Sequence, residues 1–186
     1  MVLYVARHGE SEYNVQKRFS GSIDIPLNER GFAQAGELAE KLKEVKLDVI
    51  VSSSLLRARQ TADTINKYHN LPINIRKEFV ERNFGVFEGL TWDEGRERYP
   101  DDWPRFEAMG LDDDPPNGET VYQVNDRVRP ALDELLERYP DKNVLLVCHG
   151  FTARIIHVWA KGLPLERLHG FILGNCEVVK YEVEPR

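Results

Sequence analysis

The sequence predicts an α/β fold with three layers, in which helices cover both faces of a mostly parallel central sheet. Short apolar segments rich in β-branched and aromatic residues alternate with longer segments whose apolar residues recur every three or four positions. Loops of turn residues, such as "SGSIDIPLNERG" (20–31), separate the two kinds of segment. Strands that alternate with helices in this way typically form parallel sheets, because each helix carries the chain back across the sheet.

The first half of the chain contains three predicted strands and two helices. "VLYVA" (2–6) is the first strand, "DVIVSS" (48–53) the second, and "INIRKEF" (73–79) a third strand near the edge of the sheet. A second helix is predicted from Leu55 to Tyr68. The first helix is predicted from Glu29 to Val45, with an apolar stripe that contains Phe32, Ala35, Leu38, Ala39, Leu42 and Val45.

The second half opens with an acidic segment, at about 90–119, in which prolines separate short helices joined by loops. Thr120 is a predicted N-cap for a long helix with one apolar side. "NVLLVCH" (143–149) is then a buried strand, "FTARIIHVWAKG" (151–162) a helix, and "CEVVKYEV" (176–183) a final strand.

Length and composition predict one domain over residues 1–186. The net charge is −6, and residues 92–118 hold nine acidic residues and three arginines, so nine minus three accounts for the whole imbalance. Nucleic acid is not an expected partner, because proteins that bind it generally show a basic face. The sequence shows no apolar run that could span a bilayer and no secretory signal, and its two cysteines suit reduced thiols, which predicts a cytoplasmic protein without membrane contact. The oligomeric state stays open, a homodimer included.

Basic side chains follow three of the predicted strands. "ARHGE" places Arg7 and His8 after the first strand, "SSSLLR" places Arg57 after the second, and "VCHG" places His149 after a later one. In open α/β sheets, ligands bind beyond the carboxyl ends of the strands. If these strands are parallel neighbours, two arginines and two histidines converge there with helix N-termini, an arrangement that favours an anion.

Gly9 and Gly150 directly follow the two histidines, and without a Cβ both are predicted to let a ligand approach the backbone. A metal site is the competing use of the histidines, but none has the spacing of a helical zinc motif, and the arginine next to His8 would repel a cation. Cys148 within "VLLVCH" is predicted to be a buried, inert thiol. His157 is predicted to be a helix residue without a chemical role, and surface or packing roles are assigned to His69 and His169.

"ARHGESEYN" (6–14) resembles the signature of the histidine phosphatase superfamily, the phosphoglycerate mutase-like proteins. The resemblance continues, in the family's order, through "FSGSIDIPLNERG", "SSSLLRARQTA", "ERNFGVFEG", "PNGET" and "VCHG". It therefore covers nearly the whole chain. It implies the phosphoglycerate mutase-like fold and a single histidine phosphatase domain, with the acidic segment at about 90–119 as a variable cap.

The resemblance also implies a role for individual residues. His8 would be the nucleophile that becomes transiently phosphorylated, and Glu81 the general acid for the leaving oxygen. An imidazole is nucleophilic only when neutral, and flanking guanidinium groups push its pKa down while they stabilise the transferring group. No metal or other cofactor is implied, and Glu88 is interpreted as structural. The phosphate would be bound by Arg7, Asn14, Arg57 and His149, and the substrate contacted by Ser20, Gly21 and Gly150.

The favoured activity is hydrolysis of a small phosphorylated metabolite by a metal-independent phosphatase of the histidine acid type. The family's mutases carry a longer insertion with extra basic residues, whereas the stretch here is short and acidic, with only Arg96, Arg98 and Arg105. A cofactor-dependent phosphoglycerate mutase and a non-catalytic module that binds phosphorylated ligands are the alternatives. The apolar residues of the acidic segment either cap an apolar substrate or, as we favour, form a small core: Trp92, Trp103, Phe106 and Met109.

Overall fold

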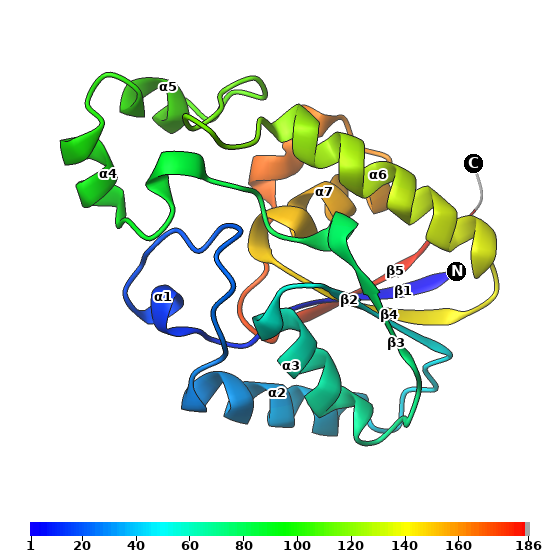
Figure 1. Cartoon of the computed structure of the whole chain (residues 1–186). Helices are drawn as coiled ribbons and strands as arrows, with labels where there is room; N and C mark the ends of the chain where they lie inside the picture. The colour runs from blue at the N-terminus through cyan, green and yellow to red at the C-terminus, as the bar shows by residue number, and fades with distance from the viewer. Residues whose placement is uncertain (185–186) are drawn as a thin grey trace.

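The computed structural model describes residues 1–184 and contains one five-stranded sheet with helices on both faces (Figure 1). The strand order is β3-β2-β4-β1-β5. Neighbouring strands are parallel except for β5, which runs antiparallel to β1. The predicted α/β class with a mostly parallel sheet is therefore confirmed. The strands are β1 (Val2–Arg7), β2 (Val49–Ser53), β3 (Ile73–Arg76), β4 (Asn143–Cys148) and β5 (Val178–Glu182).

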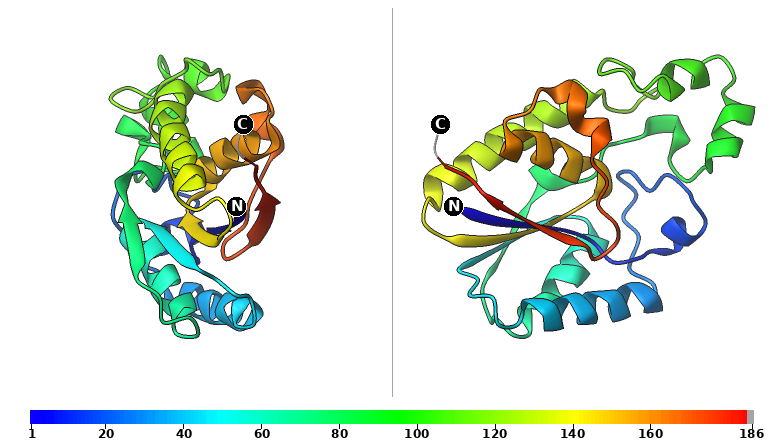
Figure 2. Two further views of the ribbon diagram at one scale, coloured as in Figure 1. Left: turned by 90° about the vertical axis from the view of Figure 1, so that its right-hand side faces the viewer. Right: turned by 180° about the vertical axis from the view of Figure 1, so that it is seen from behind.

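Two pairs of helices form the outer layers. The helices α2 (Glu29–Leu42) and α3 (Leu56–Asn66) cover one face, and α6 (Val121–Arg138) and α7 (Gly150–Lys161) cover the other, as the turned views in Figure 2 show. Since successive residues of a strand point to opposite faces, β1 buries Leu3 and Val5 in the core beneath α6 and α7, and Ala6 in the core beneath α2 and α3. Among residues 1–184, no helix has both the length and the apolar character that crossing a membrane requires.

The predicted elements occur in the predicted order, but several end earlier. The helix α2 ends at Leu42 rather than Val45, and α3 spans Leu56–Asn66 rather than Leu55 to Tyr68. The third strand stops at Arg76, because the turn η1 (Lys77–Phe79) then directs Phe79 into the core. Phe32 is 45% exposed, against prediction, since Gly31 is the residue of the first turn of α2 that packs inward.

The acidic segment forms the predicted short helices, α4 (Trp92–Arg98) and α5 (Trp103–Glu107), at the end of the molecule opposite the termini (Figure 1). Phe87, Trp103 and Phe106 form a small buried core there, as predicted for the last two. Thr120 accepts a hydrogen bond from the N–H of Gln123 at 3.1 Å, which confirms the predicted N-cap of α6. The remaining elements are α1 (Glu12–Val15), η2 (Gly85–Phe87) and η3 (Leu165–Gly170).

Two glycines determine how closely α2 approaches the loop after β1. A Cβ on Gly31 would overlap the carbonyl oxygen of Glu10, and a Cβ on Gly9 would overlap that of Gly31. The space beside Gly9 is therefore taken by α2 and not by a ligand, which corrects the prediction for Gly9. The first turn of α2 thus supports the loop that follows His8.

We expect Gly31→Ala to lower the free energy of unfolding by about 1–3 kcal/mol, because the added methyl group would overlap the backbone of Glu10. The matched control is Gly36→Ala in the same helix, where nothing lies within 4 Å of a Cβ. That change should raise the stability by about 0.5–1 kcal/mol, because alanine loses less entropy in a helix. Urea unfolding followed by circular dichroism measures both variants. Equal effects of the two substitutions would contradict the packing argument.

Candidate active site

The carboxyl ends of β1, β4 and β2 bring the predicted basic residues together. Arg7 pairs in register with Cys148, so His8 and His149 leave the sheet side by side, with ring centroids 5.1 Å apart. Arg57, in the first turn of α3, donates from Nε to Nε2 of His8 at 3.3 Å. The three strands are neighbours, as the prediction of a converging basic site requires.

His8 is buried, with 3% of its surface exposed, and its Nε2 accepts the hydrogen bond from Arg57. Nδ1 lies 2.7 Å from the carbonyl oxygen of Gly9, and since a carbonyl can only accept, Nδ1 carries the proton and Nε2 the lone pair. Burial, followed by the charges of Arg57 and Arg7, holds the pKa of His8 well below its ordinary 6.5. The nitrogen that can act as a nucleophile is therefore the one that Arg57 contacts.

Backbone carbonyls hold the two arginines in place. Arg57 donates to the carbonyl oxygens of Ile23 at 2.7 Å and Gly21 at 2.8 Å, and Arg7 donates to that of Leu173 at 3.0 Å. Within residues 1–184, Arg7 Nε is buried without a hydrogen-bond partner. The positive charge of the pair is thus available to a ligand, and guanidinium groups match phosphate oxygens in geometry.

A cavity of about 160 Å³, here called the anion pocket, opens at His8. Glu81 is the one acidic residue among its described lining residues, so the pocket is positively charged overall. Of the predicted binding residues, His149 and Gly150 do not line it. The backbone N–H of His8 donates to the carbonyl oxygen of Cys148 at 3.0 Å, which joins the start of the loop after β1 to the end of β4. The lining consists of Arg7, His8, Asn14, Arg18, Phe19, Ser20, Gly21, Arg57, Glu81 and Phe84.

The loop between β1 and α2 supplies the remaining polar groups. The side-chain oxygen of Asn14 accepts from the N–H of Ser11 at 3.0 Å, which leaves the amino group of Asn14 as the donor for a ligand. Ser20 Oγ is buried and has no hydrogen-bond partner in the described part of the chain. Gly21 has a φ of 45°, and a Cβ there would overlap the carboxylate of Glu88.

Glu88 holds this loop against the one that follows Glu81. Its carboxylate accepts from the N–H of Ser22 at 2.7 Å and from the N–H of Phe84 at 3.1 Å. Both contacts hold backbone in place, in agreement with the structural role predicted for Glu88.

Ser53, at the end of β2, contacts His149 and was missed by the sequence analysis. Its Oγ lies 2.7 Å from Nε2 of His149 and accepts from the N–H of Leu55 at 3.3 Å. If the hydroxyl proton is donated to Nε2, the proton of the neutral His149 ring resides on Nδ1, which is buried without a partner among residues 1–184. The only sequence signal is the serine run "SSS" after the strand.

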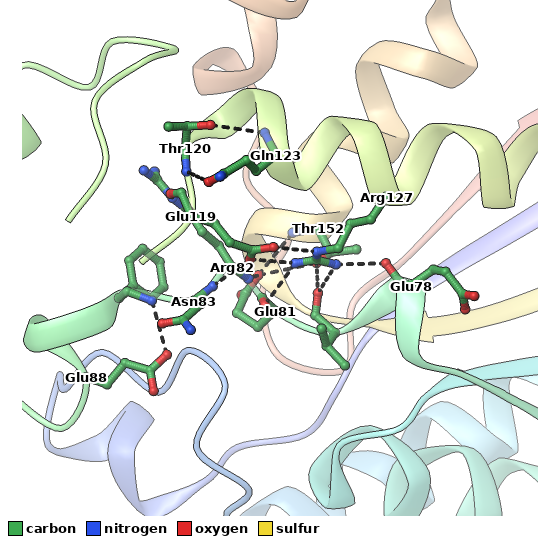
Figure 3. A network of polar contacts seen from close by, with 12 residues as sticks. Glu78, Glu81, Arg82, Asn83, Glu88, Glu119, Thr120, Gln123, Arg127 and Thr152 are labelled. Carbon is green, nitrogen blue, oxygen red and sulfur yellow. Dashed lines mark hydrogen bonds and ion pairs between the residues drawn. The ribbon is translucent and has the colours of Figure 1, made fainter. Parts of the chain in front are cut away.

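Glu81 is fixed at the N-terminus of α7 (Figure 3). Its Oε1 accepts from the backbone N–H groups of Phe151 and Thr152, both at 3.1 Å. Arg127 of α6 donates to the carbonyl oxygen of Glu81 at 3.1 Å and pairs with Glu119 at 2.8 Å (Figure 3). The helix α7 therefore holds the carboxylate of Glu81, and α6 holds its backbone. Both helices lie far from Glu81 along the chain, so no local sequence pattern reveals this arrangement.

A larger cavity of about 280 Å³, here called the distal cavity, adjoins the anion pocket. Arg7, Phe19, Glu81 and Phe84 line both, so Glu81 lies at their junction. The remainder of its wall is mostly apolar. Besides these four, its lining consists of Arg82, Trp92, Phe106, Met109, Gly150, Phe151, Arg154, His169, Ile172 and Leu173.

The distal cavity changes the interpretation of several residues. His169 was assigned a surface or packing role, but it lines this cavity and its Nε2 donates to the carbonyl oxygen of Met109 at 3.0 Å. Trp92, Phe106 and Met109 also line it, so the acidic segment supplies both a small core and part of a cavity wall. Its arginines Arg96, Arg98 and Arg105 are exposed and do not line the cavity.

Two competing chemistries were considered from the sequence. Cys148 is buried, and burial raises the pKa of its thiol, so the thiol stays protonated and inert as predicted. Among residues 1–184, no group of three or more histidine, cysteine, aspartate and glutamate side chains is arranged to hold a metal ion.

A family model described as "Histidine phosphatase superfamily (branch 1)" matches residues 3–186. The chain belongs to the histidine phosphatase superfamily. It is 40% identical over 177 residues to the uncharacterized phosphatase PhoE of Bacillus subtilis, covering 93% of this chain and 86% of that one. It is 31% identical over 183 residues to the probable phosphoglycerate mutase GpmB of Escherichia coli, covering 98% and 85%.

The solved structures support the same assignment. The α-ribazole phosphatase from Shigella flexneri superposes with a TM-score of 0.91 at 28% identity, covering 97% of this chain and 89% of that one. The family resemblance and the phosphoglycerate mutase-like fold are therefore confirmed. Proteins of this superfamily that resemble the chain include phosphatases and a probable mutase, so family membership alone does not choose between the two reactions.

Proposed function

We propose that this superfamily member is a phosphomonoester hydrolase that works through a phosphohistidine on His8 and needs no metal. The observation that carries the proposal is the neutral, buried ring of His8, whose Nε2 lone pair faces Arg57. The substrate is a small phosphorylated metabolite. We further propose that residues 1–186 form a single cytoplasmic domain with the acidic segment as its cap.

The reaction has two steps that use the same residues. First, the lone pair on Nε2 of His8 attacks phosphorus, the ester P–O bond breaks, and Glu81 gives its proton to the leaving oxygen. Then water attacks phosphorus and gives a proton to Glu81, the N–P bond breaks, and inorganic phosphate leaves. The donors proposed to stabilise the transferring group are Arg7, Arg57 and the amino group of Asn14, all of which line the anion pocket. His149 does not line it, but its unpartnered Nδ1–H belongs to a ring whose centroid lies 5.1 Å from that of His8, and we propose that it donates to the phosphoryl group once that group is bound to His8.

The position of Glu81 supports its role as general acid and base. A phosphoryl group held in the anion pocket leaves the rest of the substrate in the distal cavity, and Glu81 lies where the two meet. The bridging ester oxygen would lie at the same junction. Proton transfer requires hydrogen-bond reach between acid and leaving oxygen, and the presence of Glu81 in the lining of both cavities supports this role. Ser20, Gly21 and Gly150 form the walls on either side.

Hydrolysis is favoured over mutase activity by the way the cap uses its arginines. Arg96 pairs with Glu107 at 2.9 Å, and Arg105 pairs with Asp114 at 3.0 Å, both on the surface. A bisphosphorylated cofactor would need additional cations around the second phosphate. The cap directs none of its three arginines into the distal cavity.

The proposal predicts release of phosphate from aryl phosphate monoesters that persists in excess chelator, because the arginines supply the positive charge. His8→Ala should lose turnover by at least about a thousandfold, as removing a nucleophile does, while its far-ultraviolet circular dichroism stays unchanged. His69→Ala, outside both cavities, is the control. Binding of phosphate esters without any turnover would instead indicate the binding module. Interconversion of phosphoglycerates with bisphosphoglycerate at a higher kcat/KM would indicate the mutase.

Glu81→Gln should slow esters with poor leaving groups far more than 4-nitrophenyl phosphate, because only an alkoxide needs a proton as it departs. The measurement is kcat/KM for a series of phosphate monoesters ordered by the pKa of the leaving alcohol. Glu78→Gln is the matched control, since the Glu78 side chain pairs with Arg76 and lies outside both cavities. Equal losses across the series would remove Glu81 from the acid role.

A further inference from the structure

The loop between η3 and β5 contacts the end of β1 at several points. Arg7 donates from Nη1 to the carbonyl oxygen of Leu173 at 3.0 Å, and the backbone N–H of Cys176 donates to the carbonyl oxygen of Arg7 at 3.1 Å. Between these two contacts along the chain stands Asn175, which is half-buried and lines neither the anion pocket nor the distal cavity. Any effect of Asn175 on the reaction is therefore transmitted through residues that do line the pocket.

The amide of Asn175 contacts two residues of the loop that follows β1. Its Nδ2 donates to the carbonyl oxygen of His8 at 2.9 Å and to Oδ1 of Asn14 at 3.3 Å. Because a carbonyl oxygen only accepts, the side of the Asn175 amide that faces His8 is its amino group. One side chain from the C-terminal part of the chain thus joins the backbone of the proposed nucleophile to the side chain of a proposed phosphate donor.

The orientation of the Asn14 amide is fixed by donors on one side. Its Oδ1 accepts from the backbone N–H of Ser11 at 3.0 Å, from the Ser11 hydroxyl at 3.1 Å and from Asn175. Since a backbone N–H only donates, the oxygen of Asn14 has to face Ser11. The amino group of Asn14 then points away from these donors, and Asn14 lines the anion pocket. Hydrogen bonds to the oxygen of an amide also polarise its amino group, which makes it a stronger donor.

The peptide group between His8 and Gly9 is held at both ends. Asn175 donates to its carbonyl oxygen, and its N–H donates to Oγ1 of Thr61 at 3.1 Å. Glycine has no Cβ to restrict its backbone, so the loop after His8 depends on such contacts to keep one conformation. The carbonyl oxygen of Gly9 receives Nδ1–H of His8, and the orientation of the ring therefore follows that of this backbone.

We propose that Asn175 is a positioning residue for phosphoryl transfer, which keeps the ring of His8 and the amino group of Asn14 in one placement around the phosphoryl group. This inference rests on the proposed function and adds to it a residue outside both cavities. A displacement of about 1 Å in a reacting group can slow a reaction by about a hundredfold. Substrate binding depends less on Asn175, because Arg7 and Arg57 keep their own contacts to backbone carbonyls.

Asn175→Ala should lower kcat for 4-nitrophenyl phosphate by about tenfold to a hundredfold and change KM by less than about threefold. Asn66→Ala is the matched control, because Asn66 is also half-buried and donates to a backbone carbonyl, that of Leu71 at 2.8 Å, but lies outside both cavities. It should leave kcat and KM unchanged. Both variants are measured well below their unfolding temperatures, so that a loss of stability alone does not lower kcat. An unchanged kcat in Asn175→Ala overturns the proposal.

A double-mutant cycle tests the coupling between Asn175 and Asn14. Asn14→Ala removes the proposed donor, so the factor by which Asn175→Ala lowers kcat should be at least about threefold smaller in that background than in the wild type. Equal factors in the two backgrounds overturn the proposal.

If Asn175→Ala does not fold, Asn175→Asp takes its place. The carboxylate has nearly the same shape but no proton to donate, so kcat should fall as well, and an unchanged kcat overturns the proposal equally. Turnover that requires His8 but does not respond to Asn175 contradicts this inference alone. Absence of turnover in the wild type contradicts the proposed function as well.

Discussion

The site depends on a neutral imidazole that is buried beside two guanidinium groups, Arg7 and Arg57, neither of which forms an ion pair in the described part of the chain. Arg7 and Arg57 are held by backbone carbonyls, which satisfy some of their donors but carry no full negative charge. Their positive field disfavours protonation of His8, and burial disfavours it further. The same field attracts a phosphate dianion. One electrostatic arrangement therefore suits both the proposed nucleophile and the phosphate that it would attack, and the remainder of the fold keeps that arrangement in register.

The sheet supplies this register through strand order and direction. Because β2, β4 and β1 are parallel neighbours, the residues that directly follow their carboxyl ends lie close together at one edge of the sheet. Close packing of α2 against Gly9 then fixes the loop after His8. On the other side, the first amides of α7 and Arg127 of α6 hold Glu81. His8, the proposed nucleophile, and Glu81, the proposed acid, are thus held by different parts of the chain, and both line the anion pocket.

The sequence predicted the parts of the site that lie at strand ends, because hydrophobic periodicity locates strands and parallel order brings their ends together. Glu81 follows an irregular turn, so its assignment depended on the family resemblance. Arg154 and His169 were not recognised, since their orientation toward the distal cavity depends on how α7 and η3 pack against the cap. The prediction for Gly9 was wrong in a different way. Its lack of a Cβ was predicted to make room for a ligand, whereas it makes room for the first turn of α2.

The central claim is that His8 itself accepts the phosphoryl group. The most direct measurement is to quench the protein during turnover of a ³²P-labelled ester and to locate the label by mass spectrometry after digestion under alkaline conditions. The account predicts a phosphoramidate on His8, lost in acid and stable in base, that His8→Ala cannot form. Label on another residue, or turnover with no labelled protein at any quench time, would contradict it.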